Sequence, residues 1–217
     1  MTHIITIDGP AASGKGTLAR KLADHMDYFY LDTGAMYRLI GLAVLNANII
    51  PEDSEDQIAD MGTDMANGFQ ADMMANPDLK RDDVGQYASR CASLPKVRLA
   101  VLDLQRSLAN NPPENAQGSV LDGRDCGTVV CPEAAVKIYI TADVNERAKR
   151  RHAELQSKGI DTPFEEVLDD MKMRDDRDMN RTTAPLKPAD DATILDTSSL
   201  TIDNAFAVLK RIVEKQA

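Results

Sequence analysis

The feature that most constrains this chain lies near its N-terminal end, where an apolar run leads into a glycine-rich turn. Residues His3–Asp8 read HIITID, and the spacing G-x-x-x-x-G-K then runs from Gly9 to Lys15 before a helix-like segment. Glycines let the backbone turn so that successive N–H groups point at one anion, and the N-terminus of the following helix attracts the same charge. The pattern predicts a phosphate-binding loop between a strand and a helix; a plain glycine turn is the alternative.

The rest of the chain alternates short apolar runs with helix-like periods, which predicts a layered α/β fold with a mostly parallel sheet. Runs as short and apolar as Ser119–Asp122 suit a sheet that helices cover on both faces. We expect strands at His3–Asp8, Tyr28–Asp32, Ser119–Asp122, Val136–Thr141 and Thr193–Asp196. We expect helices at Lys15–Met26, Thr33–Asn46, Pro95–Ala109, Val144–Gln156, Pro163–Asn180 and Thr201–Gln216.

Composition and charge exclude several classes of protein. The chain has 217 residues, of which 43% are hydrophobic, so it can bury a core. No apolar run reaches the roughly 18 residues that a membrane span needs. A net charge of -10 argues against a protein that binds nucleic acid or an anionic membrane through its overall charge. Three cysteines without a C-x-x-C pair argue against a disulfide framework or a zinc site, and no secretory leader is visible, so we expect a reduced, cytoplasmic protein.

The charge is unevenly distributed along the chain. The segment Pro51–Asp83 carries ten acidic residues against Lys80 and Arg81, whereas six of the fourteen arginines lie between Arg147 and Arg181. Both stretches interrupt the alternation of strands and helices, and long excursions from a compact α/β core are commonly functional. A site for several anions would have to use the arginine-rich stretch.

Two further motifs place charged side chains just after predicted strands. After Leu31 and Asp32, Thr33 and Arg38 can offer a hydroxyl and a guanidinium to a second anion. The alternative is ordinary helix capping beside a surface arginine.

The second of these motifs is Val120-Leu121-Asp122-Gly123-Arg124-Asp125. Two apolar residues that lead into Asp122 resemble the metal-associated motif of phosphate-loop enzymes, where the aspartate would hold magnesium through water. Arg124 follows at a glycine turn, where it can reach a phosphate, and Asp125 can accept a hydrogen bond from an amino or hydroxyl group. The alternative is a capped turn whose charges pair with each other.

A fourth pattern lies on one predicted helix. Arg174, Arg177, Asp178 and Arg181 recur at i, i+3, i+4 and i+7, so three guanidiniums and one carboxylate share a stripe. A solvated helix face with internal salt bridges would give the same pattern. An enzyme that moves a phosphoryl group between two polyanions needs converging cations, because its catalysis is mostly positioning and charge stabilisation.

Taken together, these motifs resemble bacterial cytidylate (CMP/dCMP) kinases over essentially the whole chain outside the acidic segment. The matching segments, in order, are GPAASGKGT, LDTGAMYR, SRCASLPKVR, LDGRDCGTVV, VKIYITA, RDDRDMNR and APLKPADDATILDTSSL. The combination of DGRD-x-GTVV with RDDRD-x-NR is specific to that family, whereas adenylate kinases share the loop but usually have DGFPR in the second place. As in nucleoside monophosphate kinases, Gly16 follows Lys15 where many phosphate loops have a magnesium-binding hydroxyl, so Thr17 is expected to contact a phosphate.

The resemblance implies ATP-dependent phosphorylation of CMP and dCMP to CDP and dCDP with Mg²⁺, by a monomer that binds small nucleotides, not nucleic acid or membrane. The implied catalytic residues are Lys15, Arg124, Arg174 and Arg181, and Asp122 is the implied metal residue. The implied ATP-binding residues are Gly9, Pro10, Ala11, Ala12, Ser13, Gly14, Lys15, Gly16 and Thr17. The implied CMP-binding residues are Thr33, Arg38 and Arg124 at the phosphate, Ser89, Arg98 and Asp125 at the cytosine edge, and Arg174, Asp178 and Arg181 at the ribose and toward the phosphates.

The resemblance also implies one domain over residues 1–217. Its core would comprise residues 1–50, 94–157 and 190–217, with a monophosphate-binding insert over about 51–93 and a lid over about 158–189. Longer family members carry a β-rich insert, but Gly68–Asp83 shows no comparable strand pair, so the structure of the insert stays open. For three arginines that lead into the lid, a solvated basic helix face is the alternative: Arg147, Arg150 and Arg151.

Two rival functions remain at this stage. One is another kinase of the same fold class that uses UMP or AMP as acceptor. The other is a nucleotide-gated switch that hydrolyses nucleoside triphosphates, against which the chain has no N-K-x-D guanine-reading motif.

Overall fold

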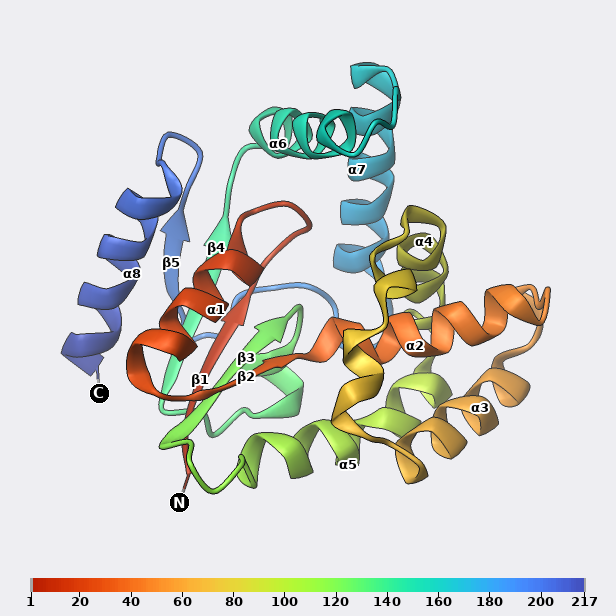
Figure 1. Ribbon diagram of the computed structural model, residues 1–217, viewed down its shortest axis with the longest axis horizontal. Coiled ribbons are helices and arrows are strands. Elements are labelled where there is room, and N and C mark those ends of the chain that lie inside the picture. The colour runs from red at the N-terminus through yellow and green to blue at the C-terminus, as the bar shows by residue number, and fades with distance from the viewer. Residues whose placement is uncertain (1, 217) are drawn as a thin grey trace.

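A single parallel sheet organises the protein, whose computed structural model describes residues 2–216 (Figure 1). Its five strands lie in the order β2–β3–β1–β4–β5, and every pair of neighbours is parallel. The strands are β1 (His3–Asp8), β2 (Phe29–Asp32), β3 (Gly118–Gly123), β4 (Val136–Thr141) and β5 (Thr193–Asp196). The predicted five-stranded parallel sheet is confirmed, and each strand end lies within one residue of its expected position.

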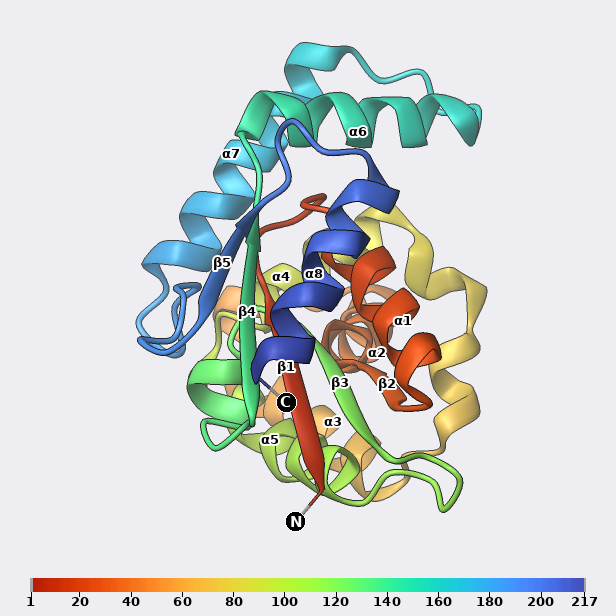
Figure 2. The same ribbon diagram turned by 90° about the vertical axis from the view of Figure 1, so that its left-hand side faces the viewer.

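Helices cover both faces of this sheet, because the strands bury alternate residues on opposite sides. Val120 packs with the helices α1 and α8, which lie in front of the sheet in Figure 2, whereas Leu121 packs toward α2 and α5 on the other face. The six predicted helices are all present as α1 (Lys15–Met26), α2 (Thr33–Asn46), α5 (Pro95–Asn110), α6 (Val144–Ser157), α7 (Phe164–Asn180) and α8 (Ile202–Gln216). The architecture is the expected three-layer α/β/α sandwich.

The acidic stretch, whose structure the sequence left open, is helical. Residues 51–93 contain η1 (Pro51–Asp53), α3 (Glu55–Asn67), η2 (Ala71–Ala75), η3 (Pro77–Lys80) and α4 (Asp82–Cys91), with no strand among them. Val84, Ala88 and Cys91 recur at helical spacing in α4 and are buried against α2 and α5. The acidic side chains face outward, and four of them form ion pairs with cations: Glu52 with Arg90, Asp56 with Lys96, Asp82 with Arg151 and Asp83 with Arg81.

The helices α6 and α7 extend beyond the carboxyl ends of the strands (Figures 1 and 2). Leu155 of α6 and Met171 of α7 belong to a small apolar cluster that also contacts Ala12, in the loop after β1. Ligands of open α/β sheets bind at this edge, where the carboxyl ends of several strands meet. Asp8, Asp32 and Gly123 stand at neighbouring positions there, at the ends of β1, β2 and β3.

The crossing of α2 and α4 offers a test of how tightly this edge is built. A Cβ atom added to Gly41 of α2 would lie 2.7 Å from the backbone nitrogen of Ala88 in α4, so only glycine lets the helices approach this closely. We expect Gly41→Ala to lower the free energy of unfolding in urea by about 1–3 kcal/mol, the usual range for overpacking. Gly68→Ala is the control, because an added Cβ there meets only ordinary contact at 3.4 Å; equal effects of the two substitutions would contradict the close crossing.

Candidate active site

The loop between β1 and α1 has the geometry expected of a phosphate-binding turn. Ala12 and Gly14 adopt left-handed φ values of 56° and 87°, and α1 begins without a side-chain cap. Its first backbone N–H groups are therefore available to an anion at the positive end of the helix. Ala11, Ala12 and Lys15 line a cleft of 890 Å³, whereas Ser13 is buried and Thr17 is exposed outside the cavities described here.

Lys15 faces Asp122, at the carboxyl end of β3. Its Nζ lies 3.6 Å from Asp122 Oδ1, and Tyr30 donates a hydrogen bond of 3.2 Å to Asp122 Oδ2. Burial lowers the pKa of Lys15, and the nearby cation of Arg124 acts in the same direction. Burial raises the pKa of Asp32 on the neighbouring strand, as does the charge of Asp122. Two carboxylates and one ammonium group therefore meet at the end of β2 and β3.

This corner can hold a divalent cation that brings most of its own ligands. Asp122 Oδ1 is buried and has no hydrogen-bond partner within residues 2–216, so a lone pair is available. The same residues contain no group of three His, Cys, Asp or Glu side chains that could form a complete protein cage. Magnesium bound to nucleotides usually keeps waters and phosphate oxygens and takes only one or two carboxylates, which fits the residues present.

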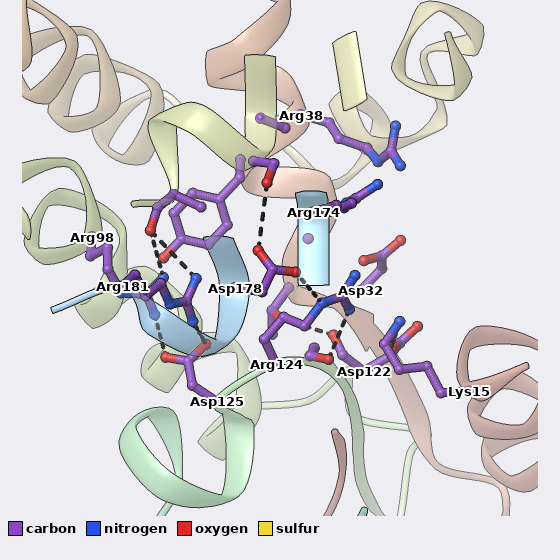
Figure 3. Close-up of a pocket in the computed structure, with 17 residues that line it drawn as sticks. Lys15, Asp32, Arg38, Arg98, Asp122, Arg124, Asp125, Arg174, Asp178 and Arg181 are labelled. Atoms are coloured by element: carbon purple, nitrogen blue, oxygen red, sulfur yellow. Dashed lines mark hydrogen bonds and ion pairs between the residues drawn. The ribbon is translucent and has the colours of Figure 1, made fainter. Parts of the chain in front are cut away.

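A second cavity, of 170 Å³, lies beside the first and collects the predicted acceptor residues (Figure 3). All nine of them line it: Thr33, Arg38, Ser89, Arg98, Arg124, Asp125, Arg174, Asp178 and Arg181. They come from α2, α4, α5, α7 and the segment around β3, so the fold brings together residues that are far apart in sequence. Ser89 and Arg98 are buried, each 6% exposed, so neither is an ordinary helix-surface residue.

Asp125 anchors one end of this cavity. It forms a buried ion pair with Arg98, and Arg181 Nη2 lies 3.6 Å from its other oxygen. The Arg98 guanidinium also lies 5.4 Å from the centre of the Tyr37 ring. Asp125 therefore pairs across the cavity with arginines of two helices rather than with its neighbour Arg124.

Asp178 occupies the middle of the cavity (Figure 3). It accepts a hydrogen bond of 3.0 Å from Arg124 Nε, and Ser89 Oγ lies 3.5 Å from its other oxygen. Burial acts to raise the pKa of Asp178, but the charges of Arg124 and Arg174 outweigh it and hold the pKa below its ordinary value. The arginine stripe on α7 is thus an internal surface, and the alternative of a solvated helix face is wrong.

Positive charge exceeds negative charge among these buried groups. Arg174 has no ion pair or hydrogen bond within the described residues, and its Nε is buried without a partner. Burial and the repulsion of Arg124 lower its pKa to about 10. In the part of the chain that the structure describes, Arg38 donates only to the carbonyl of Leu79, at 2.8 Å. Unpaired guanidiniums at a buried position are suited to a phosphate ligand, which would supply the missing negative charge.

The two cavities share one wall. Lys15, Asp32, Arg38, Arg124 and Arg174 line both of them. Four of these five residues are cationic, so anions bound in the two cavities would meet over a positively charged boundary.

The arginines of α6 have separate structural partners. Arg147 is buried and forms a double hydrogen bond to Asp175 of α7. It also donates a hydrogen bond of 3.2 Å to the Ala11 carbonyl. Arg150 donates 2.6 Å to the Thr197 carbonyl, and Arg151 pairs with Asp82 of α4. A solvated basic face is therefore wrong for Arg147, which ties the root of α6 to the phosphate loop.

Some residues of the site were not among those predicted. Tyr37 and Asp32 line the acceptor cavity, together with Gly34, Ala88 and Ala92. Asp32 caps α2, because its Oδ1 accepts a hydrogen bond of 3.2 Å from Ala35 N. Asp32 also lies beside Asp122, at the end of an adjacent parallel strand. That position in the sequence pattern was the signal that Asp32 lines the site. Tyr37 has no such signal, because an aromatic residue at helical spacing usually belongs to the core.

Comparisons with known proteins agree with this geometry. The family model described as "Cytidylate kinase" matches residues 5–216. The chain belongs to the cytidylate kinase family. A family member from Paramagnetospirillum magneticum, named cytidylate kinase, is 50% identical over 98% of each chain. Another from Rhodospirillum rubrum, also named cytidylate kinase, is 50% identical over 94% of this chain and 93% of its own.

A solved structure supports the fold independently. An uncharacterized protein from Eubacterium ventriosum superposes with a TM-score of 0.56 over 99% of each chain, at 15% identity. None of the helices within residues 2–216 combines the length and apolarity required to cross a membrane.

Asp8 gives the site a measurable pH signature. Burial raises its pKa from 3.8 to about 6, although two backbone N–H groups act to lower it. A raised carboxyl pKa stabilises the fold fully below pH 3.8, and this contribution is lost as pH rises to about 6. We expect the free energy of unfolding of the wild type, relative to Asp8→Asn, to fall by about 2 kcal/mol between pH 4 and pH 7. Urea titrations of both proteins across this range measure it, and a difference that does not change with pH contradicts the assignment.

Proposed function

We propose that this member of the cytidylate kinase family transfers the γ-phosphoryl group of ATP to CMP or dCMP, producing ADP and CDP or dCDP. The observation that carries the proposal is the shared wall of the two cavities. One cavity includes the phosphate loop and the other includes paired carboxylates and guanidiniums, and four cations line both. A phosphoryl group that passes between two anions at this wall would be neutralised from both sides.

The phosphate loop and Lys15 would hold the outer phosphates of ATP, with Asp122 holding magnesium through water. Bound magnesium would neutralise charge on the β- and γ-phosphates. Lys15 lies 3.6 Å from Asp122, so its ammonium group is positioned to move from that carboxylate to a phosphate oxygen. Thr17, in the first turn of α1, is exposed, so its hydroxyl would be accessible to a phosphate.

At the acceptor, Arg38, Arg124 and Arg174 would bind the monophosphate. Their guanidiniums are incompletely paired in the protein, and an acceptor phosphate is already anionic near neutral pH. No general base is needed, because these cations let two anions approach each other. Thr33 donates its hydroxyl proton to the Asp122 carbonyl at 2.8 Å, so in this arrangement it would meet the phosphate through its backbone N–H.

The opposite end of the cavity would read the base and the sugar. A carboxylate beside a guanidinium, as in Asp125 with Arg98, complements the amino donor and adjacent acceptors of cytosine. Uracil would place a carbonyl against Asp125 instead. Asp178 would accept a hydrogen bond from a ribose hydroxyl. Ser89 would contact the base together with Asp125 and Arg98. These pairs support CMP over UMP or AMP as the acceptor.

Residues 51–93 would act as the monophosphate-binding insert and residues 158–189 as a lid that excludes water. Leu79 accepts from Arg38, and Ser89 contacts Asp178, so both segments already contribute to the acceptor cavity. We propose that the enzyme acts as a monomer. We place its activity in the cytoplasm.

The decisive experiment is an acceptor panel with the unaltered protein. ATP is incubated with Mg²⁺ and CMP, dCMP, UMP or AMP, and ADP release is followed by a coupled assay. We expect rapid ADP formation with CMP and dCMP only, since the other bases do not match Asp125 and Arg98. ADP formation without any acceptor would favour a switch-like hydrolase, and equal turnover of all four acceptors would contradict the base assignment.

A conservative substitution tests base reading directly. Asp125→Asn keeps a carbonyl acceptor for the buried Arg98 but removes the charge that selects an amino donor. We expect the ratio of kcat/KM for CMP to that for UMP to fall by about tenfold or more. Asp191→Asn is the matched control, because Asp191 is exposed and pairs with Lys137 outside both cavities. The assignment is wrong if both variants keep the wild-type ratio.

A further inference from the structure

Asp8, at the last position of β1, binds two consecutive backbone N–H groups. Its Oδ1 accepts from Cys126 N and its Oδ2 from Gly127 N, each at 2.8 Å. The side chain is only 5% exposed, and within residues 2–216 no lysine or arginine forms an ion pair with it. The carboxylate is therefore committed to the backbone of one turn, and both of its oxygens are used.

The turn that it holds carries the acceptor residues. Cys126–Val130 forms a single π-helical turn directly after Asp125, whose backbone carbonyl accepts 2.9 Å from Val129 N. Any shift of the Cys126 and Gly127 amides would therefore displace Asp125. The Asp125 carboxylate has little freedom to compensate, because it is already paired with Arg98.

The turn also lies unusually close to β1. A Cβ atom added to Gly127 would lie 2.8 Å from Thr6 Oγ1 and 3.4 Å from Asp8 Oδ2. Thr6 is fully buried and its hydroxyl has no hydrogen-bond partner among residues 2–216, so it fills space under the turn without binding it. Among these two neighbours in β1, only Asp8 fixes the turn by hydrogen bonds.

On its other side, Asp8 is covalently joined to Gly9, the first residue of the phosphate loop. Asp8 thus lies where the phosphate loop leaves β1, and its side chain also holds the turn that follows β3. A carboxylate with two backbone N–H donors is a short, directional link, stronger than bonds between neutral groups.

We propose that Asp8 is a positioning residue that fixes the Arg124–Asp125 turn relative to the phosphate loop, so that the acceptor monophosphate binds in register with the donor. This inference rests on the proposed function, because it assigns the turn to the acceptor. Asp8 itself touches neither substrate. Its removal would therefore weaken acceptor binding while it leaves donor binding intact.

The test compares Asp8→Asn with Thr6→Val. Asparagine keeps one acceptor oxygen but turns an NH₂ group toward the second backbone donor, whereas valine preserves the volume of Thr6 and removes no hydrogen bond. For Asp8→Asn we expect about a tenfold rise in KM for CMP, with KM for ATP within about twofold of wild type. Amide exchange of Cys126 and Gly127, followed by hydrogen–deuterium exchange, should accelerate by at least about tenfold. Thr6→Val should leave both KM values and the exchange of the turn unchanged.

Thermal unfolding confirms that each variant is folded, and Asp8→Ser replaces Asp8→Asn if the latter does not fold. Parallel increases in both KM values, or equal effects of Thr6→Val, would show a general structural role and overturn the proposal. The exchange measurement needs no substrate. If amide exchange of Cys126 and Gly127 is the same in Asp8→Asn as in the wild type, the claim that Asp8 fixes the turn is overturned, whatever the activity. A wild-type protein that is inactive with CMP overturns the proposed function, and the acceptor role of Asp8 with it.

Discussion

Buried positive charge that the protein itself does not neutralise is the constraint on which the site depends. Burying a guanidinium is expensive unless a carboxylate or another acceptor compensates for it. Arg98 and Arg124 have carboxylate partners, whereas Arg174 has none within the described residues. The folded protein therefore carries excess positive charge at one edge of its sheet, and a bound phosphate would neutralise it. Affinity for anions is in this sense built into the fold.

The carboxylates at this edge limit that excess charge and fix geometry at the same time. Asp178 holds Arg124, and Asp125 holds Arg98, so the guanidiniums keep defined positions in the absence of a ligand. Asp175 does the same for Arg147, outside the acceptor cavity but against the phosphate loop. Each pair joins two elements that are distant in sequence, and the ion pairs consequently hold the site together as well as charging it.

Sequence patterns were sufficient for the sheet and the main helices because local periodicity and strand-end chemistry agree there. Lys15–Met26 and Thr33–Asn46 were predicted with their observed ends, since a glycine turn and an aspartate at a strand end mark their starts. The acidic segment was not predictable in this way, because charged residues dominate it and the apolar residues on the buried face of α4 are few: Val84, Ala88 and Cys91. Tertiary packing on α2 and α5 decides its structure.

Recognition of the site depended more on resemblance than on periodicity. Spacing placed Arg174, Asp178 and Arg181 on one stripe, but it could not say whether that stripe faced solvent or a cavity. Whether Arg147 was solvated or buried was equally undetermined, because its partner Asp175 lies on another helix. Side chains that act through long-range pairs leave no local signal, and only the fold shows which carboxylate each arginine meets.

Two of the ion pairs that attach α6 to its neighbours differ in their exposure. At its root, the Arg147–Asp175 pair is 5% and 12% exposed, whereas the Arg151–Asp82 pair farther along is 24% and 51% exposed. Dissolved salt screens exposed pairs far more than buried ones. Rising ionic strength would thus weaken the contact between α6 and the insert while the contact between α6 and the phosphate loop is largely kept.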